Sequence, residues 1–313
     1  MSGSVAAVKV WIPHEEGRAL MGPLPDGVTV EIAPRVDELP SDPATTVFWV
    51  PPFLAQTDSV GLLPKMASLR VVQLLSAGAD VWAGHTPPGV SLHDARGVHD
   101  SSTSEWVVAA ILSYLRSFPL FARAQANHDW TARRAAPTDE LAGKHVLIVG
   151  AGSIGAATTA RLEPFEVRVT SVARTARPGV HAVSDLPDLL PTADVVVVIV
   201  PLTEATRGLV STSFLAAMKD GALLVNAARG PVVDTDALVA ALSTGRIGAA
   251  VDVTDPEPLP PEHPLWDLPN VLITPHVAGS VRGLLPRGYR LVGEQLRRFA
   301  AGEPLANEVI GGY

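Results

Sequence analysis

Short apolar runs alternate with helical patterns along the first third of the chain. Each run is five residues long and is bounded by Pro, Gly or Asp, which is typical of buried strands. The runs span residues 8–12, 28–32, 46–50 and 71–75. Strands that alternate with helices in this way favour a parallel sheet, so we expect a small α/β domain here.

A second series of apolar runs begins at residue 146. Helical patterns lie between most of these runs, as at residues 235–243. The predicted strands are residues 146–149, 167–172, 195–200, 222–225, 249–253 and 271–274. Six such strands predict a doubly wound parallel sheet of order 3-2-1-4-5-6.

Three further segments complete the pattern. Ser, Thr and Asp side chains precede a helix predicted from Ser104 to Leu115, which is apolar nearly all round. Such a helix is buried in a core or at a subunit interface. Residues 131–144 are polar and contain proline, so we expect a connecting loop. Residues 286–301 carry apolar positions at helical spacing, so we expect a last helix there.

Glycines lie at the turn from the first strand of the second series to the helix that follows it. Gly150 allows a tight turn, Gly152 allows a pyrophosphate to approach the backbone, and Gly155 allows close packing of helix and strand. The helix N-terminus, at Ser153 and Ile154, offers N–H groups to that phosphate. The pattern alone is equally typical of a structural turn, but the strand before it and the helix after it favour dinucleotide binding.

Composition narrows the possible functions. A length of 313 residues suits about two domains, and 47% hydrophobic with 18% charged residues argues against disorder. The net charge of −8 argues against nucleic-acid binding. The chain has no cysteine, which excludes disulfides and Cys-based metal sites, and we predict no metal site. No apolar run reaches membrane-spanning length, and residues 5–12 are interpreted as a strand rather than a signal peptide. We expect a cytoplasmic protein.

The end of the second strand in this series indicates the type of cofactor. An NAD-binding sheet usually has an Asp or Glu there, which binds the ribose hydroxyls. This strand instead leads into Arg174, Thr175 and Arg177. A guanidinium matches the geometry of a phosphate, so we predict that NADP(H) is preferred over NAD(H). The alternative is that these arginines are simply solvated.

Three late motifs each follow a strand of the predicted sheet, at residues 226–230, 252–258 and 274–280. We therefore expect them at the carboxyl edge of the sheet, where the cofactor binds. A basic, an acidic and a titratable side chain that converge there are suited to acid–base chemistry on a carboxylate substrate.

With these motifs the sequence resembles the NAD(P)-dependent D-2-hydroxyacid dehydrogenases of the glyoxylate/hydroxypyruvate reductase kind. The resemblance covers nearly the whole chain and is carried by residues 150–155, 200–203, 206–208, 226–230, 252–259, 263–266 and 274–276. It implies a flavodoxin-like substrate domain from residues 1–98 and 285–313, and a Rossmann domain from residues 99–284. It also implies a homodimer formed through the Rossmann domain, which suits the apolar helix at residues 107–115.

The resemblance assigns roles to individual residues. It makes Arg229, Glu257 and His276 catalytic, with Arg229 and His276 also binding substrate. Arg229 would orient the substrate carboxylate, and His276 would exchange a proton with the substrate oxygen. Glu257 would favour and orient the imidazolium. Its competitors are Asp255 and Glu262, and only the Glu-Pro match to the family favours Glu257.

The resemblance also assigns binding residues. Ala77 and Gly78 would bind the substrate carboxylate through their backbone, although position alone favours a simple turn there. Asp252 would contact the nicotinamide amide. The full set expected to bind cofactor is Gly150, Gly152, Ser153, Ile154, Gly155, Arg174, Thr175, Arg177, Pro201, Thr206, Ala227, Asp252 and Gly279.

The sequence thus predicts an NADPH-preferring oxidoreductase that reduces small 2-keto acids to D-2-hydroxy acids. Relatives that oxidise formate replace the Glu with Gln, so Glu257 argues against formate. A phosphite-oxidising relative shares Arg, Glu and His, as do dinucleotide-sensing regulatory relatives with little turnover, so both stay open. The substrate side chain depends on residues 50–53 and 76–80 and on Trp266.

Overall fold

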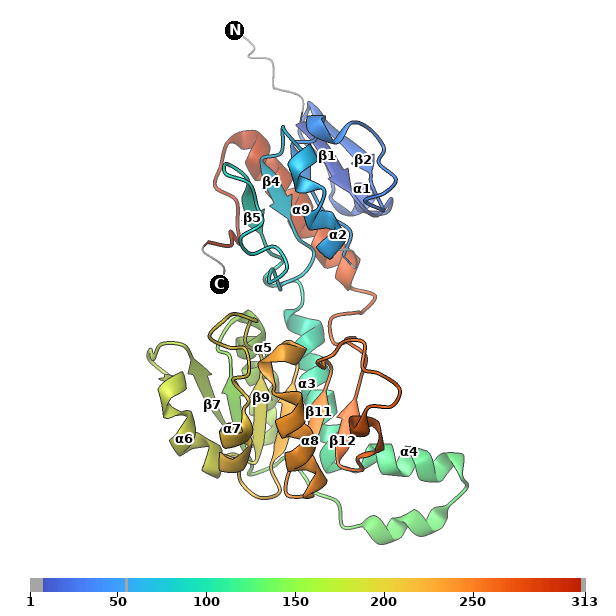
Figure 1. Cartoon of the computed structure of the whole chain (residues 1–313), viewed down its shortest axis with the longest axis vertical. Coiled ribbons are helices and arrows are strands. Elements are labelled where there is room, and N and C mark those ends of the chain that lie inside the picture. Colours follow the sequence, from blue (N-terminus) through green and yellow to red (C-terminus); the bar gives the residue numbers. More distant parts are fainter. Residues whose placement is uncertain (1–7, 54–55, 311–313) are drawn as a thin grey trace. The chain divides into compact units, whose positions relative to one another are not determined.

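The computed structural model describes residues 8–53 and 56–310. The chain divides into two compact units, each built around one parallel sheet (Figure 1). We call residues 100–281 the central unit, and residues 1–99 with 282–313 the outer unit. Residues 5–7 of the apolar N-terminal run lie outside the described residues.

The central unit contains a seven-stranded sheet of order β12-β11-β10-β9-β6-β7-β8, and all its pairings are parallel. The strands are β6 (His145–Val149), β7 (Arg168–Ala173), β8 (Val180–Ala182), β9 (Val195–Val198), β10 (Leu223–Asn226), β11 (Gly248–Val251) and β12 (Val271–Ile273). In chain order this is 3-2-1-4-5-6-7, which confirms the doubly wound class.

The predicted assignment of the third strand was wrong. That place belongs to β8, whereas β9 pairs with β6 on the opposite side from β7. β8 has only three residues, includes the exposed His181 and lies at the sheet edge. It therefore lacks the apolar run by which buried strands are recognised.

Strand residues of the central sheet alternate between two hydrophobic cores, one on each face of the sheet. Val146 and Ile148 pack with α3 and α5, whereas Leu147 and Val149 pack with α7 and α8. The helices are α3 (Asp100–Leu115), α4 (Phe118–Ala126), α5 (Ser153–Leu162), α6 (Leu186–Leu189), α7 (Thr212–Ala217) and α8 (Thr235–Ser243). The apolar helix expected at residues 104–115 is thus a core helix of this unit.

Short 3₁₀ helices occur in both units: η1 (Pro43–Thr45), η2 (Leu63–Lys65), η3 (Trp130–Ala135), η4 (Glu163–Phe165), η5 (Val183–Asp185), η6 (Leu190–Thr192), η7 (Gly230–Val232) and η8 (Pro264–Asp267). Of these, η3 lies partly in the segment that we expected to be a loop. No single described helix is long and apolar enough to cross a membrane; α3 and α4 pass that test only as a pair bent by 68°, on length and composition alone.

The outer unit contains a five-stranded parallel sheet of order β2-β1-β3-β4-β5, the flavodoxin-like order that was expected. Its strands are β1 (Val8–Ile12), β2 (Val28–Ile32), β3 (Phe48–Trp49), β4 (Val71–Gln73) and β5 (Ser91–His93). Its helices are α1 (Gly17–Leu20), α2 (Gln56–Val60) and α9 (Leu284–Ala301). The sequence did not predict β5, which has only three residues. Tyr289, Val292 and Leu296 of α9 are fully buried against one face of the sheet.

A buried amide network fastens the C-terminal segment to this unit. Gln295 donates to Gln73 Oε1 at 2.9 Å and exchanges two hydrogen bonds with the backbone of Ala306, at 2.8 and 2.9 Å. Val309 N–H donates to the carbonyl of Leu92 on β5 at 2.8 Å. The segment therefore covers the otherwise unpaired edge of β5.

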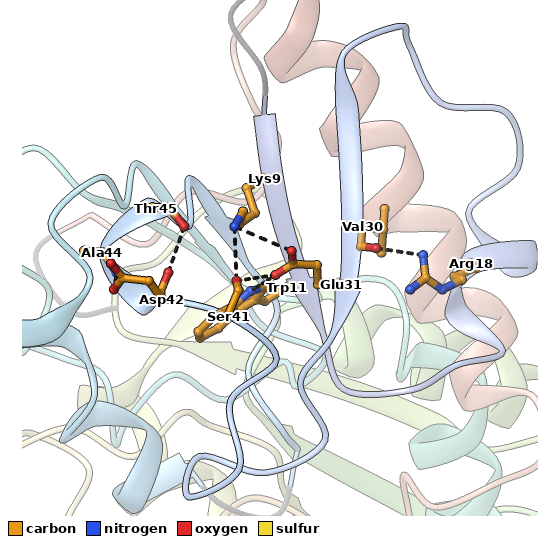
Figure 2. Close-up of polar contacts among 9 residues, drawn as sticks. All are labelled: Lys9, Trp11, Arg18, Val30, Glu31, Ser41, Asp42, Ala44 and Thr45. Carbon is orange, nitrogen blue, oxygen red and sulfur yellow. Dashed lines mark hydrogen bonds and ion pairs between the residues drawn. The ribbon is translucent and has the colours of Figure 1, made fainter.

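A second polar cluster joins β1 and β2 to the loop that follows β2 (Figure 2). Glu31 accepts hydrogen bonds from Trp11 Nε1 at 2.9 Å and from Ser41 Oγ at 2.5 Å. Lys9 Nζ donates to Ser41 Oγ at 3.1 Å and lies 3.5 Å from Glu31 Oε1. Burial raises the pKa of Glu31, but these donors and the Lys9 charge outweigh it and lower the pKa overall. The cluster therefore holds an ionised Glu31 against the sheet.

Candidate active site

The glycine turn between β6 and α5 has the geometry of a phosphate cradle. Gly150 has a φ of +125°, and a Cβ added there would lie 2.3 Å from the carbonyl oxygen of Ile199. A Cβ on Gly155 would lie 2.0 Å from the carbonyl oxygen of Gly150, so only glycine permits this helix–strand contact. Among the described residues, none would contact a Cβ on Gly152 and none caps the N-terminus of α5 with its side chain. Its N–H groups are thus oriented toward a space that an anion could fill.

Of the residues expected near the ribose, Arg177 contacts this turn. Arg174 and Thr175 are exposed just beyond β7. Arg177 donates from Nη2 to the carbonyl oxygen of Ala151 at 2.7 Å, which places its guanidinium over the glycine turn. The Ser153 hydroxyl donates to the carboxylate of Asp100, at the start of α3. Ile154 is half-buried in the first turn of α5.

The other expected cofactor residues follow neighbouring strands of the same sheet. Thr206 donates from its hydroxyl to the carbonyl oxygen of Pro201 at 2.6 Å, which closes the loop after β9. Ala227 follows β10 directly and Gly279 lies in the loop after β12; both are half-buried. All four therefore lie beyond the carboxyl ends of strands, as nucleotide binding by a doubly wound sheet requires.

The carboxyl edge of β10, β11 and β12 brings the late motifs together. His276, in the loop after β12, pairs through Nδ1 with Glu257 Oε1 at 2.6 Å. Their side chains are 47% and 42% exposed, so the pair is open to a ligand. When Glu257 accepts the Nδ1 proton, the ring is fixed with Nε2 as its other polar atom. Among the described carboxylates, Glu257 is therefore the partner of His276, rather than Asp255 or Glu262.

Arg229 lies in the loop after β10 and is half-buried. Its Nη1 donates to the carbonyl oxygen of Ala228 at 2.8 Å. The buried Asn226 holds this loop, because it accepts from Ala228 N–H at 3.1 Å and donates to the carbonyl of Arg229 at 3.3 Å. A Cβ on Gly230 would lie 1.9 Å from the Thr254 carbonyl oxygen, so the loops that carry Arg229 and Glu257 pack directly together.

Asp252 is buried, with 3% of its surface exposed, and interacts with the histidine loop. Its carboxylate accepts hydrogen bonds from the Thr274 hydroxyl and from the N–H groups of Val277 and Ala278. Within the described part of the chain, no group of three or more His, Asp or Glu side chains is arranged to hold a metal ion. The edge thus presents a cation, a carboxylate–imidazole pair and a nearby phosphate cradle.

Comparison with known proteins identifies the family. The family model of the NAD-binding domain of D-isomer-specific 2-hydroxyacid dehydrogenases matches residues 108–278, more than half of the chain. The chain belongs to the D-isomer-specific 2-hydroxyacid dehydrogenase family. As a member it is an oxidoreductase, and its relatives include glyoxylate and hydroxypyruvate reductases.

Relatives of this dehydrogenase family match most of the chain. A glyoxylate reductase from Thermofilum pendens is 35% identical over 258 residues, which cover 75% of this chain and 73% of the relative. A Xanthobacter autotrophicus Py2 family member solved with NADPH and MES is 31% identical, with a TM-score of 0.83 over 98% of both chains. The NADPH-dependent glyoxylate/hydroxypyruvate reductase from Sinorhizobium meliloti, solved with NADP and sulfate, is 28% identical, with a TM-score of 0.81 over 97% of this chain and 98% of that one.

Two of the expected substrate residues of this dehydrogenase, Ala77 and Gly78, lie in the outer unit. Ala77 and Gly78 follow β4 and are half-buried, and the Ser76 hydroxyl donates to the Gly78 carbonyl at 2.7 Å. His99 Nε2 lies 2.8 Å from the Leu75 carbonyl oxygen. The His99 ring also stacks on Phe53, with centroids 6.3 Å apart. The loops after β3 and β4 are thereby held together.

Three residues with site contacts were absent from the sequence-based set: Asp100, Asn226 and Thr274. Asp100 was considered only as part of a helix N-cap signature. Asn226 and Thr274 were considered only as members of their motifs, without a role of their own. Asp100 and Thr274 form hydrogen bonds with residues far away in sequence, Ser153 and Asp252, whereas those of Asn226 stay within its own loop. No pattern of residue types in one sequence reports such pairings.

Proposed function

We propose that this protein is an NADPH-preferring reductase that converts small 2-keto acids, of the glyoxylate and hydroxypyruvate kind, to D-2-hydroxy acids. The observation that carries this proposal is the pairing of His276 with Glu257 at 2.6 Å on the sheet edge that also bears Arg229. In this assignment the central unit binds the cofactor and the outer unit contributes the substrate loop with Ala77 and Gly78.

The glycine turn suits a dinucleotide, because Gly152 leaves open space beside uncapped N–H groups of α5. When bound, the cofactor supplies the hydride. Arg229 offers a guanidinium fork that pairs with the substrate carboxylate and turns the keto carbon toward the nicotinamide side. His276 donates a proton from Nε2 to the keto oxygen, and in the oxidative direction it takes that proton back. Glu257 holds the ring through the hydrogen bond at Nδ1.

Turnover is tested by the loss of NADPH absorbance with a panel of keto acids. We expect His276→Asn to lower kcat by about a hundredfold or more, while NADPH affinity is kept. Phe53→Ala, in the outer unit, should instead alter the preference among keto acids. NADPH binding without turnover of any keto acid would contradict the reductase assignment and favour a dinucleotide sensor, whereas oxidation of phosphite alone would favour the phosphite-oxidising type.

The NADP preference rests on Arg174 and Arg177, and on the absence of an acidic residue at the end of β7. The two solved relatives above were captured with NADPH and NADP. We expect Arg174→Ala to lower the ratio of kcat/KM for NADPH over NADH by about tenfold, the cost of one charge-assisted hydrogen bond. Arg168→Ala, at the opposite end of β7, is the matched control. An unchanged ratio in Arg174→Ala would refute this assignment.

We propose that two copies associate through α4 and η3. Figure 1 shows α4 and the segment after it projecting from the body of the central unit. Phe118 is 57%, Leu120 37% and Trp130 87% exposed, so α4 and η3 carry large apolar side chains at the surface. Trp130→Ala is expected to shift the protein from dimer to monomer in light scattering, whereas Trp266→Ala, a control outside α4 and η3, is not. A Trp130→Ala protein that remains dimeric would exclude this interface.

A further inference from the structure

Asp252 contacts the loop of His276 on both sides of the histidine. Its main-chain oxygen accepts the N–H of His276 at 2.7 Å. Its Oδ1 atom accepts the Thr274 hydroxyl at 2.5 Å and the Val277 N–H at 2.9 Å. Its Oδ2 atom accepts the Ala278 N–H at 2.9 Å. One buried residue thus accepts the backbone N–H groups of the histidine and of the two residues after it, and also the hydroxyl of Thr274 before it.

His276 needs such support because its backbone is in the left-handed region, with a φ of +53°. A non-glycine residue adopts this conformation at a cost and retains it only where the surroundings determine it. The hydrogen bonds to Asp252 hold His276 in this conformation, because they fix the chain before and after the histidine. On this backbone the imidazole pairs with Glu257 at 2.6 Å.

We infer that Asp252 and Thr274 form a positioning pair that sets the ring of His276 for proton transfer. The inference rests on the proposed function, in which His276 is the acid–base residue. The Thr274 hydroxyl has a specific part, because its donated hydrogen bond holds the Asp252 carboxylate in the orientation that accepts the N–H groups of Val277 and Ala278.

This role differs from contact with the nicotinamide amide. A carboxylate offers about four acceptor positions, and three of those on Asp252 are occupied by groups of its own chain. Loss of the pair should therefore affect the proton-transfer step more than cofactor affinity. Thr274 separates the two roles experimentally, because a substitution there removes the hydrogen bond that orients the Asp252 carboxylate but keeps the carboxylate itself.

The experiment compares Thr274→Val, which removes the hydroxyl, with Thr274→Ser, which keeps it. Thr170→Val is the matched control, since Thr170 also donates or accepts one side-chain hydrogen bond, with His145 at 2.9 Å, but lies on β7 away from the site. In Thr274→Val we expect the amides of Val277 and Ala278 to exchange with solvent roughly tenfold faster. We expect kcat to fall by about ten- to a hundredfold, with a shifted pH profile and unchanged NADPH affinity.

Thr274→Ser should restore both the amide protection and kcat, and Thr170→Val should change neither. Unchanged exchange and unchanged kcat in Thr274→Val would overturn the inference, and so would a loss confined to NADPH affinity. If Thr274→Val does not fold, Thr274→Ala is measured against Thr274→Ser in the same way. Amide exchange requires no turnover, so it tests the pair even if the protein reduces no keto acid and the proposed function fails.

Discussion

Gly152 and Gly155 belong to the same turn, but a methyl group added at each meets different surroundings. At Gly155 the new Cβ would lie 2.0 Å from the carbonyl oxygen of Gly150, whereas real Cβ atoms stay beyond 3.0 Å. The start of α5 must therefore move away from β6 by about 1 Å. Such overpacking costs about 1–3 kcal/mol. For a unit of this size that lowers the melting temperature by roughly 2–12 °C.

At Gly152 a Cβ meets no atom of the described residues within 4 Å, and the φ of −85° suits any residue. Gly152→Ala should cost the free protein only about 0.5–1 kcal/mol, because alanine is a poorer N-cap than glycine. The open space beside Gly152 is where we place the pyrophosphate. The added methyl group then clashes with the cofactor instead of with the protein. This clash should cost about 1–3 kcal/mol of binding free energy, which corresponds to a roughly 5- to 150-fold weaker NADPH affinity.

The assay measures thermal melts without cofactor and NADPH dissociation constants by fluorescence titration. Gly155→Ala should lose stability and also affinity, because its helix N-terminus moves. Gly152→Ala should lose mainly affinity. Wild-type NADPH affinity in Gly152→Ala would refute the placement of the phosphate over this turn. Wild-type melting of Gly155→Ala would refute the argument that helix and strand are too close for a methyl group.

Two predictions concern the stability of the folded chain. Burial lowers the pKa of His14, His93 and His145, so the unfolded chain binds protons first as the pH falls. Stability that is present above about pH 6.5 is therefore lost below it. The melting temperature should be lower at about pH 5.5 than at about pH 7.5, and equal melting temperatures would contradict this. Gln295→Leu leaves the buried partners of its three hydrogen bonds unpaired, so it should lower the free energy of unfolding in denaturant by about 2–5 kcal/mol. Glu294→Ala, on the exposed face of α9, should lower that free energy little.

Much of the fold could be predicted because the apolar runs are short and continuous. The strand, glycine turn and helix from β6 to α5 occur as expected, and so does the flavodoxin-like order of the outer sheet. β5 and β8 were not predicted, since a three-residue strand at a sheet edge needs no apolar run. The exposure of Trp130 was not predicted either, because the identity of a single apolar residue does not show whether its side chain is buried or exposed.

The residues of the candidate site likewise include some that could be predicted from the sequence and some that could not. Arg229, Glu257 and His276 were assigned through the resemblance to the family, and their motifs could be placed at one sheet edge because each follows a strand. The hydrogen bond between Thr274 and Asp252 joins the ends of two neighbouring strands, and its geometry depends on the register of β11 against β12. Register follows from packing across the whole sheet, so sequence alone could not identify this pair.

The same topology explains why the candidate catalytic residues depend on one another. β10, β11 and β12 are adjacent and parallel, so their carboxyl ends release three loops at one edge. Gly230 brings the loop of Arg229 against the Thr254 carbonyl of the loop that carries Glu257. Glu257 pairs with His276, whose own loop is bound by Asp252. A shift at any of these contacts therefore moves the cation, the carboxylate and the imidazole relative to one another. For that reason the rate of proton transfer should respond to substitutions that leave cofactor binding intact.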